Sequence, residues 1–241
     1  MIVNQIVRMI PTLKVNNRNL NESFYIETLG MKPLLEESAF LSLGDQSGIE
    51  KLVLEESPSM RSRKVKGVKK LARLIVKVEN PSEIEALLAR MEKLPQLHKG
   101  NKGYAFEVLS PEGDCVLVHA EDDIRDLEKV EEEVTFSKDE NIQYLTAFEI
   151  SVEVNLPEDT SSLLEKEEIE NRIVFREAQG SDLLVENNVT WDLSMLKFQV
   201  KELDLASLRQ RFEATGYFIP KSEKFFLTKD TNNVELWFEA V

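Results

Sequence analysis

Cysteine, histidine and long apolar runs are scarce in this 241-residue sequence. Its single cysteine, Cys115, cannot form an internal disulfide, which favours a reducing compartment. The segment Met1–Leu13 lacks the cationic stretch, apolar run and small-residue cleavage site of a secretory signal. No apolar run approaches the ~20 residues that cross a bilayer. We therefore expect a cytoplasmic protein that does not insert into a membrane.

The two histidines, His98 and His119, are too few for a His-rich zinc-protease site. The sequence also contains neither an HExxH string nor a GxSxG nucleophile elbow. No complete catalytic set of a known hydrolase class can therefore be read from the residues.

Basic residues are outnumbered, and the formal net charge is -14. The imbalance belongs to the second half: residues 1–120 carry 17 Lys and Arg against 15 Asp and Glu, whereas residues 121–241 carry 13 against 29. An acidic surface repels polyanions. We expect no binding to nucleic acid or to anionic membranes.

The composition changes at Glu121–Gln143, where ten acidic and three basic residues occur among few large apolar ones. Such a stretch is typical of a solvated linker. We therefore predict an N-terminal domain at 1–122, an acidic linker at 123–143 and a C-terminal domain at 144–241.

The first half contains the same order of elements twice, each time strand, helix and further strands. The first unit is predicted from a strand at Ile6–Val15, a helix at Asn19–Leu29 ended by Gly30, and strands at Lys32–Glu36, Ala39–Leu43 and Ile49–Glu55. The second unit is predicted from a strand at Leu71–Val78, a helix at Pro81–Lys93, and strands at Tyr104–Leu109 and Cys115–His119. The first half is therefore two βαβββ units.

The second half repeats the scheme as a degenerate copy. The third unit has strand candidates at Ala147–Asn155, Arg172–Glu177 and Leu183–Glu186, without a convincing helix. The fourth unit has a strand at Met195–Lys201, a helix at Asp204–Thr215, and strands at Lys224–Thr228 and Val234–Glu239. Trp191, Trp237 and the phenylalanines of these last strands are expected to lie in the core.

Several motifs resemble the vicinal oxygen chelate superfamily, to which glyoxalases and bleomycin-resistance proteins belong. They are Leu13-Lys14-Val15, Asn21, the Phe24-Tyr25 pair, Leu29-Gly30-Met31 and the turn Ser110-Pro111-Glu112-Gly113-Asp114. The longer strings NNRNLNESFYIETLGMK, EKLVLEESPSMRSRKVKGVKKL and GYAFEVLSPEGD resemble the streptococcal CppA family. The resemblance implies an α+β fold of paired βαβββ modules and, by the family's name, a proteinase that degrades complement C3. A protein that meets C3 would have an extracellular or surface role.

Metal-using members of the superfamily take one ligand from each of four strands around a cleft. The corresponding positions here are Ile10, Arg73 and Leu117, with Glu55 or Glu56 at the fourth. Isoleucine and leucine have no lone pairs to donate, and arginine is a fixed cation. We therefore expect no inherited metal site and no cofactor.

Three catalytic candidates remain, each beside a simpler structural interpretation. His119 lies two residues beyond Leu117 on the same strand face, where Glu55 could orient it as a general base. Ser57 is a candidate nucleophile, because a triad is defined by geometry. The structural alternative is that His119 only ends a strand and has no catalytic role. Another functional alternative is a relocated metal site built from Glu55, Glu107, His119 and Glu121. We expect Cys115 to be a small core residue and His98 to lie in a solvated loop.

The segment Arg61–Lys70 carries six cations in ten residues without an acid. It joins the two units at the mouth of the expected cleft. Arg61, Arg63 and Arg73 could clamp an anionic small molecule there. Glu55 and Glu56 are further ligand-binding candidates at the cleft. The alternative is a loop whose charges dock on the acidic second half.

The sequence thus leaves two functions open. The family resemblance implies a C3-degrading proteinase. The alternative is a non-catalytic member of the superfamily that binds a small molecule or a protein partner.

Overall fold

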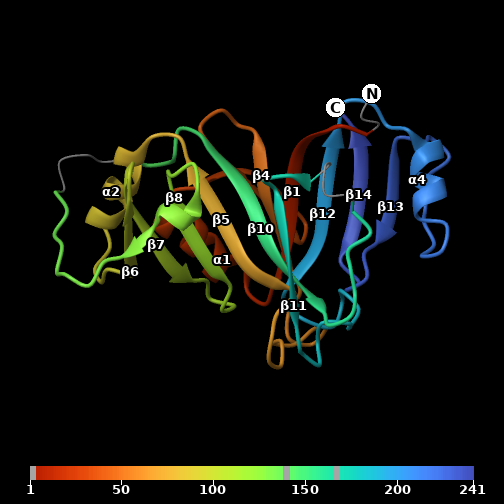
Figure 1. Cartoon of the computed structure of the whole chain (residues 1–241), viewed down its shortest axis with the longest axis horizontal. Coiled ribbons are helices and arrows are strands. Elements are labelled where there is room, and N and C mark those ends of the chain that lie inside the picture. The colour runs from red at the N-terminus through yellow and green to blue at the C-terminus, as the bar shows by residue number, and fades with distance from the viewer. Residues whose placement is uncertain (1–3, 138–141, 165–168) are drawn as a thin grey trace.

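The computed structural model describes residues 4–137, 142–164 and 169–241, so part of the predicted linker lies outside the described residues. Its strands form two seven-stranded sheets (Figure 1). Sheet 1 has the spatial order β13 (Phe225–Lys229), β14 (Glu235–Ala240), β12 (Leu193–Val200), β1 (Ile6–Val15), β4 (Glu50–Glu56), β3 (Phe40–Gly44) and β2 (Lys32–Glu37). Sheet 2 has the order β11 (Ile173–Ala178), β10 (Phe148–Pro157), β5 (Leu71–Val78), β8 (Cys115–His119), β7 (Gly103–Leu109), β6 (Gln96–Gly100) and β9 (Glu128–Lys129).

Few helices accompany the sheets. They are α1 (Arg18–Ser23), which continues as a π-helical turn at Phe24–Thr28, α2 (Pro81–Ala89), a 3₁₀ turn at Ile124–Asp126 and α4 (Leu205–Arg211). The side chains of Asn17, Asn80 and Asp204 cap α1, α2 and α4 respectively by accepting backbone N–H bonds. The architecture is therefore the α+β arrangement of repeated βαβββ units that the sequence predicts. None of the helices within the described ranges is long and apolar enough to cross a bilayer.

Each sheet combines a unit from one half of the chain with a unit from the other half. In sheet 1, β1 of the first unit pairs antiparallel with β12 of the fourth, so that Ile10 lies opposite Lys197. In sheet 2, β5 of the second unit pairs antiparallel with β10 of the third, and Ile75 lies opposite Ser151. The first and second units therefore lie in different sheets, and so do the third and fourth, whereas the second and third share sheet 2. The sequence pattern did not indicate this pairing. The boundaries of the predicted domains remain a prediction.

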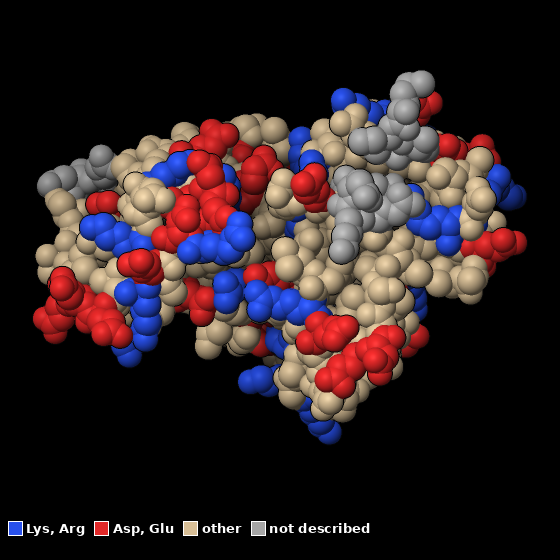
Figure 2. Space-filling model, viewed as in Figure 1, with Lys and Arg blue, Asp and Glu red and all other residues tan. Residues whose placement is uncertain are grey.

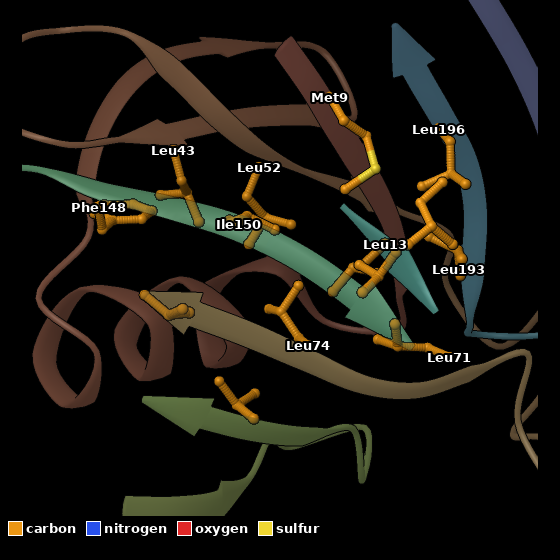
Figure 3. Close-up of a cluster of buried hydrophobic side chains, with 14 of the residues drawn as sticks. Met9, Leu13, Leu43, Leu52, Leu71, Leu74, Phe148, Ile150, Leu193 and Leu196 are labelled. Atoms are coloured by element: carbon orange, nitrogen blue, oxygen red, sulfur yellow. The ribbon is translucent and has the colours of Figure 1, made fainter. Parts of the chain in front are cut away.

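One face of each sheet packs against the other sheet, and this interface holds the core (Figure 3). Met9, Leu13 and Leu52 come from sheet 1, while Leu74 and Ile150 come from sheet 2, and all are buried. On β1 the alternation of a strand sends Leu13 and Val15 into this core. The intervening residues face outward, so each sheet keeps a second face, which we call its outer face.

Gly30 ends the first helical segment as predicted, at a φ of +69°. A Cβ at this position would lie 3.0 Å from Leu87 Cδ2 and 3.3 Å from Leu145 Cγ. The glycine therefore permits both the left-handed turn and the close packing of the first unit on α2 and Leu145.

Three local predictions were wrong. Leu183–Glu186 forms turns, because Asp182 and its neighbours bind a loop of the first half instead of a strand partner. His98 lies on β6, where it pairs with Ala105, and not in a loop. Trp191, Phe225 and Trp237, which were expected in the core, are only partly buried. Trp237 faces outward whereas its neighbour Phe238 is in the core, because alternate residues of β14 point to opposite faces.

Candidate functional site

The outer face of sheet 1 carries a hollow of about 670 Å³ between the first and fourth units. Strands β1, β4, β12 and β14 form its floor, and residues 186–188 line one side. Thr12 and Lys14 reach it from β1, because they alternate with the core residues of that strand. The apolar lining is contributed by Phe40, Val53, Met195 and Trp237.

Lysines of the hollow are paired with carboxylates on other strands of sheet 1 or beside it. Lys14 Nζ lies 3.1 Å from Glu55 Oε1, and Lys197 Nζ lies 2.5 Å from Glu50 Oε1. At the edge of the hollow, Lys229 forms an ion pair with Glu186. These cations are therefore already neutralised within the protein.

Three residues of β14 point into the hollow in a row: Glu235, Trp237 and Glu239. Trp237 Nε1 donates to Glu239 Oε2 at 3.0 Å, and the indole stacks on Phe225 with ring centroids 3.8 Å apart. Burial, more than any neighbouring charge, raises the pKa of Glu235 above its usual value. Sequence analysis missed this row. Its signal is the alternation of Glu, Trp and Glu in a strand whose other residues are apolar.

The four superfamily metal positions do not form one site, which corrects the expectation of a single cleft. Ile10 and Glu55 lie in sheet 1, whereas Arg73 and Leu117 lie in sheet 2, because the first two units do not share a sheet. Ile10, Leu117 and Arg73 offer no donor to a divalent cation. Glu55 is paired with Lys14. These side chains do not fit a bound metal, and nowhere in the described part of the chain do three His, Cys, Asp or Glu side chains gather as metal ligands would.

The outer face of sheet 2 is occupied by ion pairs around Arg73. Arg73 lies 3.6 Å from Glu107 and 3.7 Å from Glu153, and Arg176 lies 2.7 Å from Glu153. On the molecular face shown in Figure 2, basic side chains lie interspersed with acidic ones over the half that contains sheet 2. Arg73 is therefore held by carboxylates of its own sheet.

His119 and Glu55 are not brought together, since β8 lies in sheet 2 and β4 in sheet 1. The imidazole is 2% exposed, and neither ring nitrogen has a hydrogen-bond partner among the described residues. Burial above all, and then Lys77, lowers the pKa of His119 to about 4. The same separation of sheets keeps Glu55 away from Glu107, His119 and Glu121, the other members of the relocated metal site.

Ser57 is buried at the end of β4 and bonded to other groups. Ser62 Oγ donates to the Ser57 carbonyl at 2.8 Å and lies 2.9 Å from Ser57 Oγ, while Trp191 Nε1 donates to the same carbonyl at 2.6 Å. Glu56 Oε1 accepts the backbone N–H of Arg18 at 3.0 Å. Both side chains therefore fix local structure where the chain leaves β4.

The cationic segment Arg61–Lys70 docks on residues 182–192 of the second half, and the two loops meet at the lower edge of Figure 1. Arg63 forms a two-bond ion pair with Asp182 at 2.6 and 2.8 Å. Lys70 is buried and donates to the Val185 carbonyl at 2.7 Å. Arg61 is exposed and forms no ion pair with any described residue. The arginines do not converge on a common point, and two of the three are paired with carboxylates.

The remaining candidate, Cys115, lies on the outer face of sheet 2 beside Glu107 and Arg73. Burial raises the pKa of its thiol to about 11, which disfavours the nucleophilic thiolate. The geometry therefore agrees with a small structural residue.

Two of the superfamily motifs contact each other in the structure: the region around Asn21 and the turn Ser110–Asp114. Glu112 Oε1 accepts the Asn16 backbone N–H at 2.8 Å and Asn21 Nδ2 at 3.2 Å. Tyr25 is fully buried next to Asp114, and burial raises its pKa. These residues therefore connect α1 to the β7–β8 turn and are structural.

Comparisons with known proteins agree with this architecture. The CppA N-terminal family model matches residues 8–130, and the CppA C-terminal model matches residues 145–238. The cppA protein from Streptococcus pneumoniae TIGR4 is 67% identical over 100% of both chains, with a TM-score of 0.95. No curated protein matches this chain.

Two more distant structures share the fold alone. A Bacillus subtilis protein, provisionally assigned as a dioxygenase, is 13% identical over 99% of this chain and 86% of its own, with a TM-score of 0.61. Glyoxalase I from Zea mays is 10% identical over 97% of this chain and 92% of its own, with a TM-score of 0.54. The chain belongs to the CppA family and has a glyoxalase-like fold.

Proposed function

We propose that this chain binds a small organic molecule in the hollow on the outer face of sheet 1. The observation that carries the proposal is the hollow itself: its volume of about 670 Å³ lies within the range of small-molecule sites. Such sites combine an apolar lining with a few oriented polar groups. The apolar lining is supplied by Phe40, Met195 and Trp237, and the oriented polar groups are the carboxylates of β4 and β14.

The hollow is built on a rigid floor, which supports a binding role. Strands β1 and β12 are paired from Ile6 to Leu13, and β4 and β14 flank them on either side. The ion pair Lys14–Glu55 joins the adjacent strands β1 and β4, and Lys197–Glu50 joins β12 to β4 across β1, so these side chains are held in place before a ligand arrives. A site that is ordered in advance loses less entropy on binding.

The competing function is the C3-degrading proteinase that the family resemblance implies. Proteolysis through a serine or cysteine requires a nucleophile within hydrogen-bond reach of a base. Ser57 Oγ instead contacts Ser62, and Cys115 has a raised thiol pKa. Among the candidates from the sequence, the geometry therefore favours binding over cleavage.

Ligand-detected NMR with a mixed library of amines, acids, alcohols and neutral aromatic compounds tests the binding proposal. The full-length protein is compared with Met195→Trp, which fills the hollow, and with Val174→Trp on the exposed outer face of β11. Binders should be lost in the first variant and retained in the second. A second blocking variant, Thr12→Phe, serves if Met195→Trp does not fold, as judged by circular dichroism. A library without binders, or binders that both blocking variants retain, overturns the proposal.

A cleavage assay with purified complement C3 tests the alternative. Wild-type protein, Ser57→Ala and His119→Ala are incubated with C3, with and without chelator. We expect no cleavage product from any of them. Cleavage by the wild type that one substitution abolishes would establish a proteinase and locate its site.

A further inference from the structure

We infer that the hollow on sheet 1 takes an organic cation, whose ammonium or amidinium group lies between the Glu235 carboxylate and the Trp237 indole. The inference rests on the proposed function and specifies its ligand. It depends on the charge of the hollow and on the row of side chains along β14.

The first argument is the balance of charge around the hollow. Its lining contains four carboxylates, from Glu55, Glu186, Glu235 and Glu239, but only the two ammonium groups of Lys14 and Lys197. Lys14 forms an ion pair with Glu55, and Lys197 forms one with Glu50. The nearby Lys229 forms an ion pair with Glu186. Within the described residues, neither Glu235 nor Glu239 forms an ion pair, although Lys229 and Lys14 lie near enough to Glu235 to act on its charge. A cationic ligand would add a direct partner for these two carboxylates.

These two carboxylates differ in what they already bind. Glu239 accepts Trp237 Nε1 at 3.0 Å and Gln199 Nε2 at 3.1 Å, so neutral donors fix its position. Glu235 forms no hydrogen bond or ion pair through its side chain with any residue in the described ranges, although it is half-buried. A partly desolvated carboxylate without a partner is costly, and a cation would relieve that cost. Glu235 is therefore the acceptor with free capacity.

Trp237 supplies the second attraction for a cation. Glu235 and Trp237 are two residues apart on β14, so both side chains project from the same face. The Phe225 ring stacks on the indole at an interplanar angle of 18°, which orders it before a ligand binds. Tryptophan is the aromatic side chain that attracts cations most strongly through its π face.

The rest of the lining indicates the body that carries the cation. Phe40, Val53 and Met195 are apolar and lie on the strands across from β14 or next to it. They can cover a flat or aliphatic body, while Glu235 and Trp237 hold its charged end. The ligand class is therefore an amine or amidine with an apolar body.

Isothermal titration calorimetry with three probes of similar shape tests the inference. The probes are 2-phenylethylamine, 2-phenylethanol and phenylacetate, which are cationic, neutral and anionic at pH 7.5. We expect the amine to bind about tenfold more tightly than the alcohol, and the acid to bind most weakly. Glu235→Gln should lower the amine affinity about tenfold and should lower the amine affinity more than the alcohol affinity. The control Glu92→Gln makes the same charge change at an exposed position after α2 and should alter neither.

The outcomes separate this inference from the proposed function. If the alcohol or the acid binds as tightly as the amine, or if Glu235→Gln retains the amine preference, the cation site is overturned while the hollow still binds small molecules. If none of the probes binds and the mixed library also yields no binder, both fail. If Glu235→Gln does not fold, Trp237→Leu serves as the second test variant. Trp237→Leu should reduce the amine affinity more than the alcohol affinity.

Discussion

Arg63 and Asp182, 119 positions apart in the sequence, form a two-bond ion pair: Nη1 donates to Oδ2 at 2.6 Å and Nη2 donates to Oδ1 at 2.8 Å. The carboxylate also accepts the backbone N–H of Lys66 at 2.7 Å. One buried aspartate thus holds the loop of the first half on the turns of the second half.

Arg63→Ala should destabilise the protein more than Arg61→Ala does, because it removes both side-chain hydrogen bonds that Arg63 donates to the buried Asp182 carboxylate. Urea unfolding measures the change. Arg61→Ala is the matched control and should lie within about 0.5 kcal/mol of wild type, since Arg61 is exposed. Equal effects of the two substitutions would contradict the assigned role of the pair.

His119 should make stability depend on pH between about 6.5 and 4. Its folded-state pKa is lowered to about 4, chiefly by burial, so the unfolded chain binds this proton at a higher pH than the folded protein does. Stability is therefore full above the unfolded pKa of about 6.5 and is lost as the pH falls toward 4, by up to about 3 kcal/mol. His119→Leu should flatten this part of the unfolding free energy curve. An unchanged slope in the variant would refute the prediction.

Gly30→Ala should cost about 2 kcal/mol or more, because it combines a positive φ with a close approach to Leu87. Gly48→Ala is the control, since Gly48 also has a positive φ, +76°, but a Cβ there meets nothing within 4 Å. It should cost only about 1 kcal/mol, for backbone strain alone. The difference between the two thermal shifts reports the packing term, and its absence would argue against close packing at Gly30.

Unfolding should be one cooperative transition, because each sheet contains strands of both halves. Phe198 is fully buried on β12 and stacks on Phe238 at 5.0 Å. Phe198→Ala should lower the unfolding free energy by about 3 kcal/mol. Far-ultraviolet circular dichroism and tryptophan fluorescence should shift together. If two separate transitions were seen, and Phe198→Ala shifted only one of them, the halves would fold independently.

Local patterns predicted most of the elements but not their partners. The strand at Ile6–Val15 was predicted with its observed bounds, because alternation and β-branched residues mark it locally. The pairing of β1 with β12 depends on contacts between residues far apart, which no local pattern encodes. For the candidate site, too, only what depends on local sequence was predicted. Glu55 was named and lines the hollow, whereas Glu235 and Trp237 were missed because the fourth unit was not placed next to the first.

Strands β1 and β14 lie on the two sides of β12 in Figure 1, because the first and last units share sheet 1. Ile6 pairs with Val200, so one of the two neighbours of β1 is synthesised long after it, whereas the other, β4, follows closely. Until β12 exists, one edge of β1 has no strand partner. Late closure of such distant contacts slows folding and favours wrong pairings in the meantime. Sheet 1 therefore cannot be completed before β12 has been synthesised.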